Sequence, residues 1–271
     1  MILISYLSGF DFLHYISINK RPESDYIRFH VTDDYKNEMA ALKNPTCREL
    51  HISGLKQDSF EYFVSNYAQE FLVIRLAHCN LINNFSCLQS IGTLEYLMID
   101  WNIRATKLWD MSQNTSLKGL YLSDVKKVNN LSDIVTAPNL KELAIDETVD
   151  SQLGSNKWRL ASLSPIQNAP RLEKLFLVIS KIEDESILPL LQMAHLKKLH
   201  ITTSLFTLED FATLNAKLKN TSVKPDRPFY INENDESDLY ALVVGKGRAV
   251  KRNSPKLVEL QKRWDDILSQ T

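Results

Sequence analysis

Glycine and cysteine are scarce in this sequence of 271 residues, which contains seven glycines and three cysteines. So few glycines argue against an enzyme that holds phosphate groups in several glycine-rich loops. The cysteines, Cys47, Cys79 and Cys87, are too few for a disulfide framework and are typical of a reducing compartment. No close pair of cysteines or histidines completes a zinc-binding spacing, so we expect no metal and no cofactor.

Long apolar runs and an excess of one charge are also missing. No stretch approaches the roughly 20 apolar residues of a membrane-spanning helix. The apolar N-terminus has no basic residue before Asp11 interrupts it, unlike a signal peptide. Lysine and arginine number 32 against 33 aspartates and glutamates, which argues against a dedicated nucleic-acid-binding protein. We therefore expect a cytoplasmic protein that contacts no membrane.

Leucine is the residue in excess, with 39 occurrences, and it recurs at a regular spacing. Seven segments at intervals of 23, 24 or 32 residues begin at Cys47, Phe71, Leu94, Leu117, Leu140, Leu172 and Leu196. The fourth and sixth residues of every segment are leucine or isoleucine, and this alternation predicts a half-buried strand. Apolar residues at spacings of three precede the later strands, which suits a short helical or 3₁₀ segment.

A single unit of this size cannot enclose a core, so we expect the seven units to stack. Stacking places one strand of each unit in a single parallel sheet, at residues 49–51, 73–75, 96–98, 119–121, 142–144, 174–176 and 198–200. The middle units have neighbours on both sides. Their inward side chains are therefore predicted to be nearly fully buried, namely Leu120, Leu122, Leu143 and Ile145.

The segments at residues 71–81 and 94–102 resemble the leucine-rich repeat consensus L-x-x-L-x-L-x-x-N/C-x-L. The 23-residue period is similar to the short, internalin-like repeats of bacteria. The resemblance implies an α/β solenoid, with a curved parallel sheet on the concave face and short helical or 3₁₀ segments behind it. The ninth position departs from the consensus at Leu55 and Val125, so the backbone groups of these turns must find other partners.

The residues outside the repeats are expected to cap both ends of the solenoid. The chain then divides into a β-rich N-terminal cap, the repeats and a C-terminal cap at residues 1–45, 46–206 and 207–271. We predict N-terminal strands at residues 12–18 and 26–31. The C-terminal cap is predicted to contain a helix from Thr207, a strand at 239–244 and an amphipathic helix after Ser254, with Leu257, Leu260, Trp264 and Leu268 on one stripe.

Two segments each allow two interpretations of their role. The long fifth period contains an insertion at residues 149–157, which is either a tolerated surface loop or part of a binding face. The basic residues at 246–252 follow a turn between strands, although their charges can also contact an anion.

The predicted concave face carries aromatic and acidic side chains together. The candidate partner-binding residues are Met98, Asp100, Trp101, Tyr121, Asp124, Asp146, Glu147 and Phe176. Aromatic anchors beside carboxylates are typical of a binding hot spot for a basic protein. The alternative is a solvated sheet on which aromatic side chains pack against same-face neighbours. Phe176, Val178 and Ile179 either form an exposed apolar surface or lie beneath the insertion or the C-terminal cap.

No catalytic motif is present, so we assign no catalytic residues and expect a protein that is not an enzyme. The sequence predicts a protein-recognition module that binds a partner through the concave face. A regulatory or immunity-type protein that inhibits an enzyme or toxin is the second hypothesis, and an enzyme with a site at the cap junction is the third. Nucleic acid is not expected as a partner.

Overall fold

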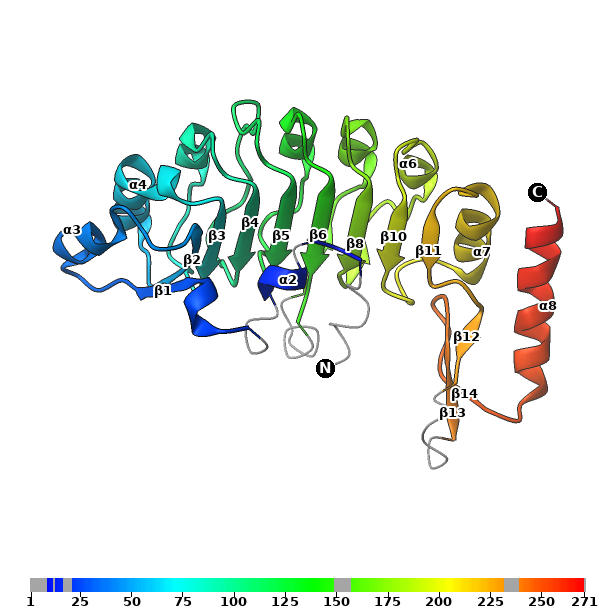
Figure 1. Cartoon of the computed structure of the whole chain (residues 1–271). Helices are drawn as coiled ribbons and strands as arrows, with labels where there is room; N and C mark the ends of the chain where they lie inside the picture. Colours follow the sequence, from blue (N-terminus) through cyan, green and yellow to red (C-terminus); the bar gives the residue numbers. More distant parts are fainter. Residues whose placement is uncertain (1–8, 12, 17–20, 149–156, 232–238, 271) are drawn as a thin grey trace.

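A sheet of nine parallel strands runs through the whole molecule (Figure 1). The computed structural model describes residues 9–11, 13–16, 21–148, 157–231 and 239–270. All seven predicted strands are present and parallel, as β2 (Glu49–Ser53), β3 (Val73–Ala77), β4 (Tyr96–Asp100), β5 (Gly119–Ser123), β6 (Glu142–Asp146), β8 (Lys174–Val178) and β10 (Lys198–Ile201). This prediction is confirmed.

The side chains of alternate strand residues point to opposite faces of the sheet. The fourth and sixth positions of each repeat point into the main core, and Leu120, Leu122, Leu143 and Ile145 are fully buried there, as predicted. The core is closed from behind by short helices (Figure 1). These are α4 (Gln57–Asn66), α6 (Leu188–Leu191) and the 3₁₀ helices Ala68–Glu70, Ser86–Ser90, Ser132–Thr136 and Ser164–Asn168. We call the other face, which carries the third, fifth and seventh positions, the concave face.

The chain turns in the same way after each of the first four repeat strands. The eighth position has a positive φ in each repeat, at Gly54, His78, Trp101 and Asp124, with values of 82°, 54°, 57° and 51°. In the third repeat the ninth residue, Asn102, is buried and donates hydrogen bonds to the carbonyls of Cys79 and Ile82, at 3.0 and 2.8 Å. The turn exposes the eighth side chain in the second and third repeats, at His78 and Trp101, whereas Asp124 in the fourth is buried. In the third repeat the ninth residue joins neighbouring repeats.

The sheet extends by one strand beyond the repeats at each end. At the N-terminal end β1 (Ile27–His30) pairs with β2, as expected for a strand at 26–31. The predicted strand at 12–18 is wrong, because residues 13–16 form the helix α2 (Leu13–Ile16). The remaining N-terminal helices are the α-helix α3 (Tyr35–Glu38) and the 3₁₀ helices Glu23–Asp25 and Met39–Leu42.

At the C-terminal end, β11 (Ser222–Lys224) adds a strand that the sequence analysis did not predict. The predicted helix is α7 (Leu208–Lys217), and Thr207 caps it by accepting a hydrogen bond from the Asp210 amide at 3.1 Å. The amphipathic helix α8 (Pro255–Ser269) lies at the end of the molecule, and the stripe prediction holds except at Leu268, which is partly exposed. In the sequence, the residues between α7 and α8 also form a small antiparallel sheet of β12 (Phe229–Tyr230), β13 (Tyr240–Val243) and β14 (Val250–Lys251).

The insertion predicted at 149–157 lies outside the described residues, apart from Lys157. Two short strands follow it and pair in parallel at the carboxyl edge of the main sheet, β7 (Arg159–Leu160) and β9 (Lys181–Ile182).

Candidate functional site

The concave face is covered by an N-terminal segment of the chain, of which the structure describes residues 9–11 and 13–16. Its helix α2 lies in front of the sheet in Figure 1. Phe10 is buried, and its ring meets the ring of Phe176 on β8 edge-on with the centroids 6.2 Å apart. Together they belong to a second apolar cluster, which we call the concave cluster. Its other buried members are Val73, Tyr96, Met98, Tyr121 and Ala144.

Polar contacts hold the N-terminal segment to the strands. The backbone N–H of Asp11 donates to both carboxylate oxygens of Glu142, at 3.0 and 2.9 Å. The ammonium of Lys174 lies 2.6 Å from Glu142 and 3.3 Å from the Asp11 carboxylate. Glu142 is itself buried, so these partners compensate for the loss of water around its charge. Asp11 is thereby fixed above β6 and β8.

Most of the predicted partner-binding side chains are therefore not open to solvent. Met98, Tyr121 and Phe176 lie in the concave cluster, and the carboxylates of Asp146 and Glu147 are also buried. Of the two interpretations of Phe176, Val178 and Ile179, the exposed apolar surface is wrong, since Phe176 and Ile179 are buried and Val178 is partly buried. Phe10 covers Phe176, a contact that the sequence analysis did not consider. Whether these residues bind a partner stays a prediction.

The four predicted carboxylates do converge, at the carboxyl ends of β4, β5 and β6. Asp100 pairs with Arg75, and Asp124 and Glu147 lie 4.0 and 3.1 Å from the ammonium of Lys126. The Tyr121 hydroxyl donates to Asp146 at 3.0 Å. We call Asp100, Asp124, Asp146 and Glu147 the acidic cluster.

Burial changes the acidity of this cluster. It raises the pKa of Asp146 to about 7, and the neighbouring charges of Asp124 and Asp100 act in the same direction. Burial likewise raises the pKa of Asp100, although Arg75 opposes the shift. Across the described ranges, one oxygen each of Asp100, Asp124 and Asp146 is buried without a hydrogen bond. Among the described residues, the four carboxyl groups of the acidic cluster contact two cations, Arg75 and Lys126, and the raised pKa of Asp146 reduces the negative charge of the cluster near pH 7.

Trp101 is the predicted residue that is plainly exposed, with 52% of its surface accessible. Its ring meets the ring of His78, from the preceding repeat, edge-on at 5.1 Å. Two further apolar side chains, Leu81 and Ile103, are exposed in the turns that follow β3 and β4. We call His78, Leu81, Trp101 and Ile103 the Trp101 rim, and it lies beside the acidic cluster because Asp100 precedes Trp101.

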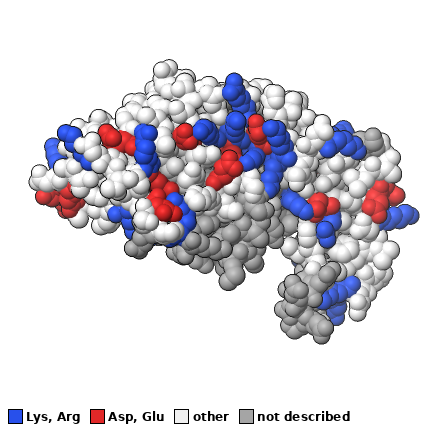
Figure 2. Space-filling view, viewed as in Figure 1, with Lys and Arg blue, Asp and Glu red and all other residues white. Residues whose placement is uncertain are grey.

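The opposite charge gathers on another part of the same face. Lys174, Lys198 and Lys224 come from the neighbouring strands β8, β10 and β11, and Figure 2 shows basic side chains over β6 and β8. His200 lies among them, and burial, followed by the charges of Lys198 and Lys224, lowers its pKa to about 4. The sequence analysis missed this basic region because lysines spaced by one repeat look like solvated strand residues.

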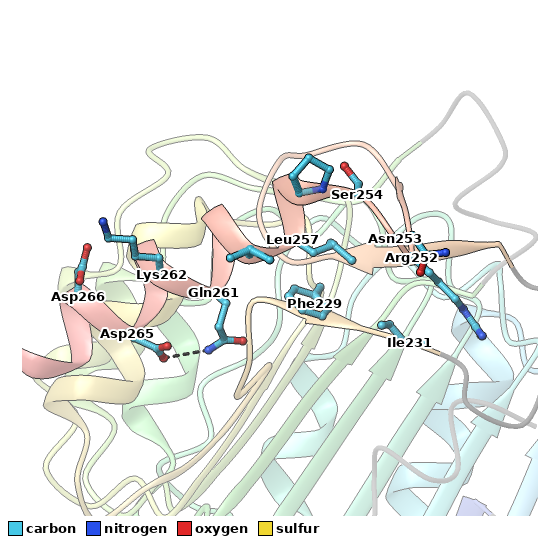
Figure 3. A pocket seen from close by; sticks show the side chains of 12 residues that line it. Phe229, Ile231, Arg252, Asn253, Ser254, Leu257, Gln261, Lys262, Asp265 and Asp266 are labelled. Carbon is cyan, nitrogen blue, oxygen red and sulfur yellow. Dashed lines mark hydrogen bonds between the residues drawn. The ribbon is translucent and has the colours of Figure 1, made fainter.

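A separate groove lies at the C-terminal end, between α8 and the small antiparallel sheet (Figure 3). Its volume is about 760 Å³, and Phe229, Ile231, Leu257 and Val258 provide its apolar lining. The rim carries both charges, including Lys262 and Asp265, and Asp265 accepts a hydrogen bond from Gln261 at 2.9 Å. The groove lacks a convergent set of polar groups that would define a ligand.

Other kinds of site were sought in the described part of the chain. No group of three metal-ligating side chains is found among these residues. No helix within them is long and apolar enough to cross a membrane. The cysteines Cys47, Cys79 and Cys87 are free, and burial raises the pKa of Cys79 to about 12, which keeps its thiol protonated.

Comparisons with known proteins find similarity among solved structures. No protein-family profile and no curated protein matches the chain. A solved leucine-rich repeat protein of Leptospira interrogans is similar to it, with 18% identity, a TM-score of 0.45 and 86% of this chain covered. The present chain spans 63% of the length of that protein. The identification rests on this chain's own geometry, in which seven repeats each place a leucine- or isoleucine-bearing strand in one parallel sheet. The chain therefore folds as a solenoid of leucine-rich repeats.

Proposed function

We propose that this chain is a protein-recognition module that binds its partner at the Trp101 rim of the concave face. Repeat solenoids use their extended concave surfaces for binding. A stack of hydrogen-bonded strands also presents its side chains in fixed positions, so that little conformational entropy is lost when a partner docks.

Trp101 is the observation that carries this proposal. The eighth position requires a left-handed backbone, which Gly54 adopts in the first repeat without steric cost. A tryptophan there is disfavoured by about 1–2 kcal/mol, and its side chain is half exposed, so it contributes little to the core. The residue therefore suits neither the turn nor the packing. Exposed tryptophan is, however, the side chain most enriched among residues that dominate protein interfaces.

The acidic cluster indicates the charge of the partner. Asp100 precedes Trp101 in the sequence, and Asp124 occupies the same position as Trp101 in the next repeat. The acidic cluster has more carboxyl groups than its contacting cations Arg75 and Lys126. The negative electrostatic potential of such a cluster speeds the association of a basic protein and disfavours that of an acidic one. A basic partner with an apolar contact for Trp101 is therefore the partner we propose.

Substitution of Trp101 by glycine separates binding from folding. Trp101→Gly restores the residue that the turn prefers, so the variant should fold with undiminished stability while losing the partner. The measurement is quantitative affinity capture from a lysate of the source organism, with wild type and variant compared. We expect one protein or complex to be at least tenfold depleted, as for the loss of a dominant interface residue.

Glu185→Gly is the matched control, because Glu185 is an exposed residue with a φ of 49° outside the Trp101 rim. It should capture the same proteins as the wild type. The proposal is wrong if Trp101→Gly captures every protein that the wild type captures, in equal amount.

A further inference from the structure

We propose that the concave surface beneath residues 9–16 is a docking site for a protein segment with an aromatic side chain followed by a carboxylate. Residues 9–16 occupy this site as an internal ligand until such a segment displaces them. The inference does not rest on the Trp101 rim, because it concerns the concave cluster and the basic region beside it.

The N-terminal segment is attached to the sheet but is not part of its framework. Its helix α2 has four residues, far fewer than an isolated helix needs for stability. Its described residues form no strand pairing with the sheet. They pack on the concave cluster, which is separate from the main core between the strands and the helices behind them. The segment can therefore leave without opening the main core.

The surface recognises the aromatic ring of Phe10 from two sides. The Phe176 ring meets it edge-on, and the ammonium of Lys198 lies 5.4 Å from its centroid, within the range of a cation–π contact. The backbone approaches closely as well, because a Cβ at Gly9 would lie 2.8 Å from the Lys198 ammonium. Gly9 has a φ of 85°, which glycine adopts readily. The site therefore accepts an aromatic residue that follows a glycine, as Phe10 follows Gly9.

The surface also selects a negative charge next to the ring. Asp11 follows Phe10 and places its carboxylate 3.3 Å from the Lys174 ammonium. Lys198 has no carboxylate partner among the residues that the structure describes. Burial and the charge of Lys174 lower its pKa, as expected for a cation in a basic surrounding. An acidic segment relieves this repulsion, whereas a basic segment would increase it.

The first experiment uses the wild-type chain and a fluorescein-labelled peptide with the sequence of residues 8–16. Hydrogen exchange of residues 9–16 in the protein is measured with and without excess peptide. The Asp11 amide is protected by Glu142 in the docked state. Displacement should therefore accelerate exchange in residues 9–16 at least tenfold, while β4, β5 and β6 remain protected. Unchanged exchange at saturating peptide would contradict the proposal.

The second experiment weakens the internal ligand. A tethered segment competes at millimolar effective concentration, so the double variant Phe10→Ala/Asp11→Ala should bind the labelled peptide at least tenfold more tightly than the wild type. In that background Lys198→Glu should reduce the affinity at least tenfold. Lys107→Glu, the same charge change on an exposed residue between β4 and β5, should leave it unchanged.

Three results would overturn the proposal. The first is equal affinity of the wild type and the double variant for the peptide. The second is equally tight binding of a peptide with alanine and lysine in place of the phenylalanine and aspartate. The third is a two-chain complex of the wild type in light scattering that the peptide dissociates, because this would assign the surface to a second copy of the chain. If the double variant fails to fold, the wild-type exchange experiment decides the question.

Discussion

The sheet has an apolar cluster on each face, and the two clusters are built from different kinds of sequence. The main core contains the leucines and isoleucines of the fourth and sixth positions, which recur in every repeat. The concave cluster contains dissimilar residues from the third and fifth positions, covered by the N-terminal segment. Neighbouring repeats therefore supply both sides of the first cluster, whereas the second depends on residues from a distant part of the chain.

This difference implies different energetics. A cavity in the main core has helices on one side and strands on the other, so it cannot collapse without distorting several repeats. A defect in the concave cluster can be relieved when residues 9–16 lift and water enters. The concave cluster also borders the buried hydrogen bond from Tyr121 to Asp146, and the raised pKa of Asp146 makes stability there depend on pH.

The largest expected effect compares two adjacent residues of β8. Leu177 faces the main core and Phe176 faces the concave cluster, and both are fully buried. Leu177→Ala should reduce the free energy of unfolding by about 2–5 kcal/mol. Phe176→Ala should cost at least about 1 kcal/mol less, although it removes a larger side chain, because the covering segment can move. Urea unfolding of both variants measures the difference, and an equal or larger loss for Phe176→Ala would make the concave cluster part of the framework.

The second-largest expected effect is the dependence of folding stability on pH that Asp146 causes. Its pKa of about 7 lies above the ordinary aspartate value of 3.8, so the folded state binds more protons than the unfolded state between these values. The contribution of Asp146 to stability is therefore present at pH 4 and is lost as the pH rises toward 7. Relative to Asp146→Asn, the wild type should lose on the order of 2 kcal/mol over this interval.

Urea unfolding at several pH values provides this measurement. Asp110→Asn is the control, because hydrogen bonds from Ser112 lower the pKa of the exposed Asp110 below its ordinary 3.8. The contribution of Asp110 is therefore lost only as the pH falls below that value, and this variant should parallel the wild type between pH 4 and 7. Parallel pH profiles for the wild type and Asp146→Asn would show that Asp146 titrates normally.

The third effect concerns the attachment of the N-terminal segment. Glu142→Gln removes the charge that accepts the Asp11 N–H and pairs with Lys174. We expect a loss of about 1.5 kcal/mol, the lower end of the range for a hydrogen bond to a charged group. Exchange of the Asp11 amide, followed by NMR, should accelerate. Glu173→Gln, which breaks the more exposed pair with Lys197 at 2.9 Å, should change neither quantity measurably.

The smallest expected effect is a gain in folding stability, whereas the preceding ones are losses. Trp101→Gly relieves a left-handed backbone strain, so thermal unfolding should show an unchanged or slightly higher stability, by up to about 1 kcal/mol. A clear loss of stability would mean that Trp101 packs on the fold more tightly than its exposure indicates.

The repeat strands and the main core could be predicted because their signal is local and recurs seven times. Leu120 and Ile145 are buried for a reason that is visible within each segment, the alternation of apolar residues. The short strand β11 was missed because three residues before Pro225 carry too little pattern.

The state of the concave face could not be predicted in the same way. Alternation shows that Tyr121 and Phe176 face away from the main core, but not what covers them. Phe10 lies 166 residues before Phe176 and belongs to no repeat, so no spacing relates the two. The left-handed backbone at the eighth position could not be predicted either, because Gly54 is the only glycine among the four residues there that have a positive φ.

The N-terminal segment also restricts how many repeats the chain can have. Repeat arrays usually tolerate duplication or deletion of a unit, because each unit contacts only its neighbours. Here Tyr15 packs on Tyr96 of β4 while Phe10 packs on Phe176 of β8. A unit inserted between these strands would move them apart by about 4.8 Å, beyond what so short a segment can follow. Docking of this single non-repetitive strap thus requires the present number of units between β4 and β8, while units added outside these two strands remain compatible with docking.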